Sequence, residues 1–392
     1  MKLDVTEKII AGGPKDFMEV RHIILKGSNR EIGRHLTNYA QQHLDFQLQP
    51  AENPLHVKAG QRFMSLNWPC QFERMKGVAD FFGHDITTDE YDFSTLNYLI
   101  PELGCACVFY PGKMMNDGHN RLTRNFDFTT GSLSGAFNME NPEDDQVATS
   151  RPFLFEIYPE KGYPTLFMCA YDLLGIALDG MNSEGLSVAL LSVSESHQNG
   201  TFEPRGFQGG GLNEGQLPRF ILETCATAEE ARLALLSVNQ YYSYDPSHYI
   251  IADSSGDAFV WEMSAGRNAP HIINADGAPL PVTNHLLHHT DHIRSESMDW
   301  SVHRMDVLKQ YLNDHKGKFT PEEIHKLCTQ IAPVTPAGQG QFNTAPDPTR
   351  TLWTSCYNLD KQSVEIDFYL GEDEGYTGKG IRRSDPVCVT LS

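Results

Sequence analysis

Cys105 is the residue in this sequence whose surroundings best suit covalent chemistry. It follows Gly104, and Arg124 and Asp127 come 19 and 22 residues later. If the chain were cut before Cys105, the new α-amino group would have a reference pKa of about 7.7–8 and could act as general base for the thiol beside it. Asp127 could orient that amine, and Arg124 could bind a carbonyl or hold the thiolate. The combination indicates a cysteine that attacks carbonyl carbon without a histidine.

The same residues also have ordinary structural interpretations. A free cysteine is most often a small buried apolar residue, and Arg124 with Asp127 would form an ion pair at the end of a hairpin. On spacing alone these interpretations outweigh the catalytic one. Cys107 is a rival nucleophile, two residues further along the same predicted strand. We favour Cys105 because the glycine before it leaves room for the thiol to reach the preceding carbonyl. Cys107 would then line the substrate pocket.

Four histidines at helical spacing form an alternative reactive cluster, namely His285, His288, His289 and His292. Two or three imidazoles on one helix face could bind zinc. The H-E-x-x-H motif of many zinc hydrolases is absent from this stretch. We therefore predict that the protein uses neither a metal ion nor another cofactor, and we keep a metal-dependent hydrolase as an alternative function.

The elements that must position these residues change character near residue 104. Before it, the sequence predicts a strand at 20–26 and helices at 30–46, 60–80 and 88–99, with Ser28 and Glu31 as a capping box for the first helix. After it, the β-branched and aromatic-rich run CACVFY and the alternating run LTRNFDF flank a turn at Asn116-Asp117-Gly118 and predict a hairpin.

Further strands and helices follow in separate runs. Strands are predicted at 165–170, 174–179, 186–193, 248–253, 258–263, 351–357 and 363–369. Helices are predicted at 217–225, after a cap at Thr227, at 302–314 and at 321–331. Because strand runs and helix runs are segregated, the pattern favours a layered α+β fold over a doubly wound parallel sheet.

The segment GCACVFYPGKMMNDGHNRLTRNFDF resembles the start of the mature chain in the acyl-CoA:6-aminopenicillanic acid acyltransferase-like peptidases. These are similar to the bile-salt hydrolases and acid ceramidases of the choloylglycine-hydrolase group. Other segments resemble the family in the same order along the chain: RHIILKGSNREIG, MNSEGLSVALLS, LPRFILETCATAEEA, YIIADSSGDAFVWE, VTNH and TLWTSCYN. The resemblance therefore extends over nearly the whole sequence.

The resemblance implies a fold, a maturation step and an activity. The fold would be the four-layer αββα sandwich of the N-terminal-nucleophile hydrolases. A precursor would cut itself between Gly104 and Cys105 and leave an α/β heterodimer. Residues 1–104 would form a mainly helical propeptide or α chain, and residues 105–392 the catalytic β chain. Cys105 would attack linear C–N amide bonds and form a thioester with the acyl group.

The resemblance also assigns the other site residues. Arg124 and Asp127 match the two residues that flank the nucleophile, and Asn284 in T-N-H matches an asparagine that donates to the oxyanion. Arg304 matches a later active-site arginine. Bile-salt hydrolases have a further asparagine at the end of the N-E-x-G-L strand, where this sequence has Ser192. The second oxyanion donor would therefore be Ser192 or a backbone N–H.

Composition and charge exclude several classes of partner. The net charge is −20, with 51 acidic and 31 basic residues, and such a chain repels nucleic acid and anionic membrane surfaces. No apolar leader opens the sequence, and eight scattered cysteines favour a reducing compartment. We expect a cytoplasmic enzyme that acts on a small N-acyl amide, with water, an acceptor amine or acyl-CoA as the second reactant. A non-catalytic binding protein is the remaining alternative.

Overall fold

The computed structural model describes residues 2–97, 104–131, 149–193, 210–243, 246–263, 269–288, 299–334, 349–375 and 377–391. The strands of these segments form two sheets. The nine-stranded sheet has the order β1 (Asp4–Gly12), β2 (Glu19–Gly27), β5 (Phe153–Pro159), β6 (Thr165–Cys169), β7 (Asp179–Asn182), β8 (Ser187–Ser192), β9 (Ser247–Ala252), β10 (Ala258–Met263) and β11 (Pro270–Asn274). The seven-stranded sheet has the order β12 (Leu280–Val282), β3 (Gly104–Tyr110), β4 (Arg121–Thr129), β13 (Thr349–Asn358), β14 (Ser363–Glu372) and β15 (Ile381–Arg383), with β16 (Val387–Thr390) also paired to β14.

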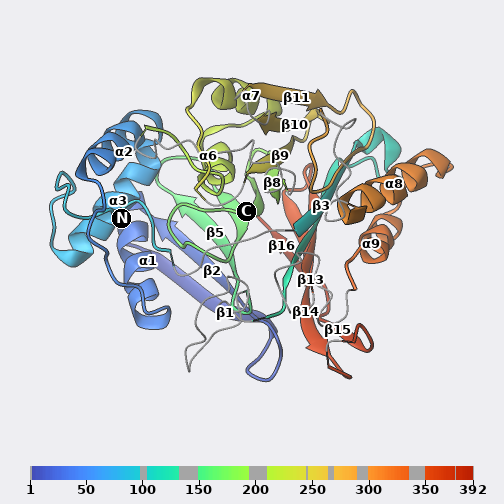
Figure 1. Ribbon diagram of the computed structural model, residues 1–392, viewed down its shortest axis with the longest axis horizontal. Coiled ribbons are helices and arrows are strands. Elements are labelled where there is room, and N and C mark those ends of the chain that lie inside the picture. Colours follow the sequence, from blue (N-terminus) through green and yellow to red (C-terminus); the bar gives the residue numbers. More distant parts are fainter. Residues whose placement is uncertain are drawn as a thin grey trace.

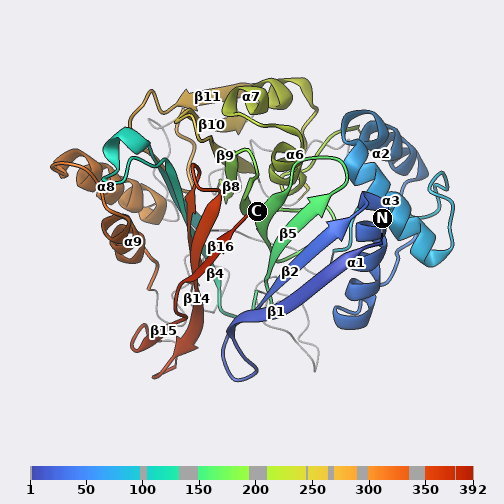
Figure 2. The same cartoon turned by 180° about the vertical axis from the view of Figure 1, so that it is seen from behind.

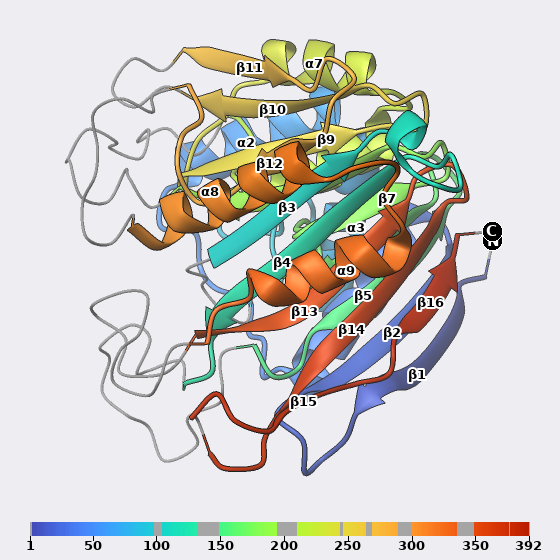
Figure 3. The same cartoon turned by 90° about the vertical axis from the view of Figure 1, so that its right-hand side faces the viewer.

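The two sheets face each other, and helices lie on their outer sides (Figures 1 and 2). Beside the nine-stranded sheet lie α1 (Asn29–His43), α2 (Pro54–Asn67), α3 (Pro69–Phe82), α6 (Gln216–Thr224) and α7 (Ala228–Ser237). Figure 3 shows α8 (Asp299–Asp314) and α9 (Pro321–Gln330) across the outer face of the seven-stranded sheet. A short 3-10 turn, η1 (Gly112–Met114), follows β3. No helix of the described segments is long and apolar enough to cross a membrane.

Strand pairing supports a mixed α/β protein and not a doubly wound one. Neighbouring strands are antiparallel throughout the described pairs except for β2 and β5, which are parallel. The β3 strand is buried on both faces. Cys105 and Cys107 belong to the large core between the sheets, whereas Ala106 and Val108 belong to a second core with residues of α8 and α9. Since side chains alternate along a strand, Cys105 faces the other sheet.

The segment before residue 104 is an integral part of this architecture. It supplies β1, which the sequence did not predict, and β2, whose parallel partner β5 lies beyond residue 104. Arg74 on α3 forms a fully buried ion pair of 2.6 Å with Glu223 on α6, and Trp68 Nε1 donates to the same carboxylate at 2.9 Å. Arg219 completes the group through its Nε atom, 2.5 Å from Glu223. Removing one member of such a group would leave buried charges without partners, which is costly, so the group ties the two parts of the chain together.

The predicted N-caps are confirmed at Ser28 and Thr227, but in this described part of the chain the reciprocal bond of the predicted capping box is not formed, because the Glu31 carboxylate accepts the Ser28 hydroxyl. The Ser28 side chain accepts the N–H of Glu31 at the start of α1, and the Thr227 side chain accepts the N–H of Glu230 at the start of α7. These caps satisfy N–H groups that have no partner within the helix.

The helix predicted at 60–80 is two helices, α2 and α3, separated at Trp68 because the residue before Pro69 disfavours helical backbone. Two other predicted elements are wrong. Residues 88–97 are not helical, because Asp92 accepts the N–H of Ser94 in a local turn; residues 98–99 lie outside the described segments. The strand predicted at 174–179 is a turn until Asp179, because the Asp172 carboxylate accepts the N–H groups of Leu174 and Gly175. In both cases a side-chain carboxylate competes with regular backbone pairing.

A cut in the chain between Asn97 and Gly104 should leave the two pieces assembled, because β2–β5 pairing and the Arg74–Glu223 pair hold them together. The fragments should co-elute in size-exclusion chromatography in buffer and separate in urea. Glu223→Gln should weaken the assembly by about 3–5 kcal/mol, since it leaves two buried arginines, Arg74 and Arg219, without their counter-charge. Spontaneous separation of the wild-type fragments in buffer would contradict this.

Candidate active site

The β3–β4 hairpin places the reactive residues by its register. Cys105 lies opposite Phe126, and Cys107 lies opposite Arg124. Directly opposed residues of an antiparallel pair project from the same face, so these side chains point between the sheets. Asp127 lies opposite Gly104 and projects from the other face, toward α8. The predicted hairpin is therefore confirmed, and it divides the site residues between two faces.

Cys105 is fully buried and lies beside a guanidinium group. Its Sγ atom is 3.1 Å from Nη2 of Arg124. Burial raises the pKa of the Cys105 thiol, and the positive charge of Arg124 opposes that rise. The ionised form of the thiol is therefore favoured mainly by Arg124, with a smaller contribution from Arg304.

Arg124 is held by contacts to the facing sheet. Its Nη1 atom donates to Asp179 Oδ1 on β7 at 2.5 Å, and Nη2 also donates to the carbonyl of Leu190 on β8 at 2.9 Å. The side chains of Arg124 and Asp179 are both inaccessible to solvent. The guanidinium therefore has one orientation that satisfies these acceptors and reaches Cys105 Sγ.

Asp179 is a site residue that the sequence analysis missed. It accepts hydrogen bonds from Trp353 Nε1 at 3.2 Å, Ser355 Oγ at 2.8 Å and Tyr357 OH at 2.7 Å, all on β13. The available signal was an aspartate within the apolar run LLGIALDGM, because a carboxylate in a buried run needs a partner. Its partner could not be named, since Arg124 lies 55 residues away in the sequence.

Asn284 lies at the backbone nitrogen of Cys105. The Cys105 N–H donates to Asn284 Oδ1 at 2.8 Å, and Asn284 Nδ2 donates to the carbonyl of Ser192 at 2.9 Å. A backbone N–H only donates and a carbonyl only accepts, so the two partners fix the amide orientation. Ser192 takes part here through its carbonyl, and the oxyanion roles of both residues stay predictions.

Asp127 and Arg304 meet on the α8 side of β4. Arg304 Nη2 is 2.7 Å from Asp127 Oδ2, and Thr351 Oγ1 donates to Asp127 Oδ1 at 2.5 Å. All three guanidinium nitrogens of Arg304 are buried without a hydrogen bond among the described residues, so its contact with Asp127 is an ion pair by distance. In the uncut chain Asn284 accepts the Cys105 N–H; that Asp127 orients the α-amine formed by a cut stays a prediction.

Cys107 shares the buried face but not the contacts of Cys105. Burial raises the pKa of the Cys107 thiol well above its usual value. The hydrogen bond from Arg124 goes to the sulfur of Cys105. The choice between the two cysteines remains a prediction, and the geometry favours Cys105.

The two histidines of the cluster that lie in the described segments contact different partners. His285 Nδ1 lies 2.8 Å from Ser301 Oγ, and His288 Nδ1 lies 2.7 Å from Glu262 Oε2. His289 and His292 lie outside the described residues. Among the described residues, no three His, Cys, Asp or Glu side chains are arranged to hold a metal ion.

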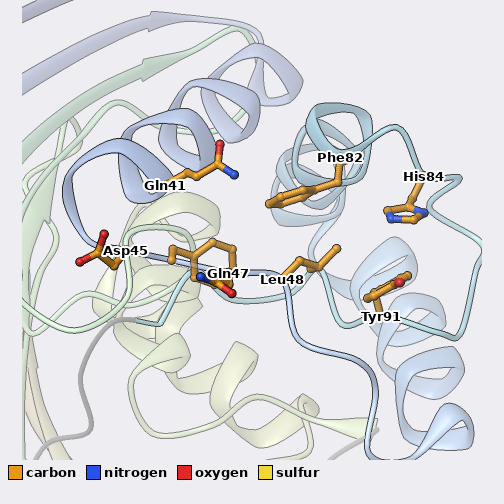
Figure 4. A pocket seen from close by; sticks show the side chains of 8 residues that line it. Gln41, Asp45, Gln47, Leu48, Phe82, His84 and Tyr91 are labelled. Atoms are coloured by element: carbon orange, nitrogen blue, oxygen red, sulfur yellow. The ribbon is translucent and has the colours of Figure 1, made fainter.

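A cavity of about 440 Å³ lies away from these residues, on the segment before residue 104 (Figure 4). Its lining consists of Gln41, Asp45, Phe46, Gln47, Leu48, Phe82, His84 and Tyr91. None of these belongs to the group around Cys105, so this cavity does not serve that thiol.

Residues 114–373 match the family model of acyl-coenzyme A:6-aminopenicillanic acid acyl-transferase. Among solved structures, a mutant conjugated bile acid hydrolase from Clostridium perfringens is 14% identical with a TM-score of 0.43, covering 71% of this chain and 96% of that one. Penicillin V acylase from Agrobacterium tumefaciens is 16% identical with a TM-score of 0.44, covering 67% and 83%. No curated protein sequence matched.

Asp179→Asn should lower the free energy of unfolding by about 3–5 kcal/mol, because the charge of Arg124 would stay buried without its counter-charge. Urea denaturation measures the effect. Asp117→Asn is the matched control: its partner Arg121 lies on the same strand, but Asp117 is 34% exposed. The control should lose about 1 kcal/mol or less. Equal losses in the two variants would show that the buried Arg124–Asp179 pair contributes no more to the free energy of unfolding than the exposed pair.

Proposed function

Because the chain belongs to the acyl-coenzyme A:6-aminopenicillanic acid acyl-transferase family, we propose that it is a self-processing cysteine enzyme that forms a thioester on Cys105. The family places it among the enzymes that hydrolyse linear amides or transfer their acyl groups. The observation that carries the proposal is the position of Cys105, whose sulfur lies 3.1 Å from Arg124 and whose backbone N–H is bound by Asn284.

The proposed fold is the αββα sandwich of the N-terminal-nucleophile hydrolases. Two facing sheets with helices on their outer sides support it (Figure 1). In that arrangement residues 1–104 form the α chain and residues 105–392 the β chain of a heterodimer. The buried pair of Arg74 with Glu223 would retain the α chain after the cut.

Maturation would begin with attack of Cys105 Sγ on the carbonyl carbon of Gly104. The C–N bond breaks as the Cys105 nitrogen takes the proton that the thiol gave up, and the Gly104 acyl group moves to sulfur. Water then hydrolyses this thioester, which releases the Gly104 carboxylate and restores the thiol beside a free α-amine. Asn284 supports this step because its Oδ1 atom orients the nitrogen of the bond to be broken.

Turnover would use the same sulfur with the new amine as base. The amine takes the thiol proton, the thiolate attacks the amide carbonyl, and Asn284 Nδ2 donates to the oxyanion. The substrate amine leaves with a proton, and water or an acceptor amine takes the acyl group from the thioester. With an acyl-CoA donor, the CoA thiol is the leaving group instead. Arg124 would stabilise the thiolate, and Ser192 or a nearby N–H would be the second oxyanion donor.

The substrate we propose is a small N-acyl amide, and the proposed compartment is the cytoplasm. All eight cysteines are free in the structure, which supports a reducing environment. The net charge of −20 argues against nucleic acid and anionic membranes as partners.

Cys105→Ala should block both maturation and turnover, whereas Cys107→Ala should block neither. Alanine has no atom that can accept the Gly104 acyl group, and Cys107 lies about 7 Å further along the strand at roughly 3.3 Å per residue. Denaturing gels, N-terminal sequencing and assays against a panel of N-acyl amides measure the outcome. A mature chain that starts at Cys107, or a wild-type protein that stays uncut and inactive, would refute the proposal.

Asn284→Ala should lower kcat by roughly 10²–10³-fold if its amide stabilises the oxyanion. Steady-state kinetics on the best substrate of the panel provide the measurement. Asn182→Ala is the control, because this buried asparagine bonds to the carbonyls of Leu222 and Cys225 and to N–H groups of its own turn, and none of these described contacts involves Cys105. It should lower stability and leave kcat within about twofold. A similarly small effect of Asn284→Ala would make T-N-H a structural motif here.

A further inference from the structure

Asn284 lies in a short turn, residues 283–288, that follows β12 and is anchored at both ends. On the β12 side, Thr283 Oγ1 donates to the carbonyl of Ser301 on α8 at 3.1 Å, and the Ser301 hydroxyl lies 2.8 Å from His285 Nδ1. These contacts join the turn to the layer outside the seven-stranded sheet. The far end of the turn, at residues 287–288, has a separate set of partners.

The far end is held by one carboxylate of the opposite sheet. Glu262 on β10 is fully buried, and its Oε1 atom accepts the backbone N–H of Leu287 at 2.8 Å. Its Oε2 atom accepts the backbone N–H of His288 at 3.2 Å and lies 2.7 Å from His288 Nδ1. His248 Nδ1, on the neighbouring strand β9, lies 2.9 Å from Oε1. Glu262 therefore binds the turn through two backbone groups and one side chain.

The charge on Glu262 is stable in this position. Burial opposes its ionisation, but hydrogen bonds from His248, from the Leu287 N–H and from His288 outweigh burial and lower the pKa of Glu262 to about 2. The ionised Glu262 carboxylate therefore stabilises the folded protein fully above its reference pKa of about 4.3. This contribution is lost as the pH falls through about 2. The anchor thus persists across the working range of any enzyme near neutral pH.

We propose that Glu262 is a positioning residue that acts through Asn284. By holding Leu287 and His288 it sets where the Asn284 amide sits between Cys105 N and the Ser192 carbonyl. The inference rests on the function proposed above. A shift of about 1 Å in a group that orients a reacting bond can lower a rate roughly 10²-fold. Loss of the anchor should therefore slow both self-cleavage and turnover without touching either reacting atom.

Glu262→Gln is the informative substitution. It keeps the volume of the side chain but turns one acceptor into an NH₂ group that faces N–H donors. We expect self-cleavage, followed on denaturing gels, to slow about tenfold or more, and kcat to fall similarly with little change in KM. Glu223→Gln is the matched control: it removes a carboxylate that is also buried and paired, and whose partners Trp68, Arg74 and Arg219 make no described contact with Asn284. It should lower stability at least as much and leave both rates within about twofold.

A double-mutant cycle separates positioning from a general loss of structure. If Glu262 acts through Asn284, Glu262→Gln should change the rates by less than about twofold in an Asn284→Ala background. Multiplicative effects of the two substitutions would overturn the inference. A fall in activity with Asn284→Ala but not with Glu262→Gln would refute this inference alone. No effect of Asn284→Ala would instead refute the proposed function of that residue.

Hydrogen exchange supplies a readout that needs no activity. In a Cys105→Ala precursor, the backbone N–H of residue 105 can still donate to Asn284. Glu262→Gln should raise the exchange rate of the peptide that starts β3, and Glu223→Gln should not. Unchanged protection in the Glu262 variant would contradict the inference even if the wild-type protein never cleaved itself.

Discussion

The buried ion pair of Arg124 and Asp179 is the interaction on which the rest of the site depends. Arg124 belongs to the seven-stranded sheet and Asp179 to the nine-stranded one, and both side chains are sealed from solvent. Charges in such a place cost several kcal/mol unless they are paired and hydrogen-bonded. Three further donors from β13 complete the shell of Asp179. The two sheets are therefore fixed relative to each other at the place where Cys105 meets the guanidinium.

A second polar connection between the sheets crosses at Asn284. Its amide joins the Cys105 nitrogen on β3 to the Ser192 carbonyl on β8, and Glu262 ties the same turn to β10. In the proposed reaction the Cys105 nitrogen is a peptide nitrogen before maturation and an amine afterwards. One acceptor placed at this atom would serve both stages, which explains why the uncut chain already holds the site in an assembled form.

The part of the chain before residue 104 is structural as well as a leader to the proposed cut. It contributes β1 and β2 to the nine-stranded sheet, and Trp68 and Arg74 converge on Glu223 in the core. A precursor can therefore complete its core before any bond is broken. This order matters for a self-processing enzyme, because the nucleophile and the bond it attacks must be aligned by a folded framework.

The sequence by itself determined those features that depend on neighbours along the chain. The β3–β4 hairpin follows from alternation around a tight turn, and the starts of α1 and α7 follow from Ser28 and Thr227 as caps. Local patterns failed at Asp92 and Asp172, where carboxylates bind nearby N–H groups and break regular structure. Only the tertiary structure decided that Asp179 holds Arg124 and that Glu262 holds the turn of Asn284. The first contact joins strands of the two sheets, and the second joins β10 to the turn after β12 of the other sheet. A buried charge in a sequence indicates that a partner is needed, but not which distant residue will supply it.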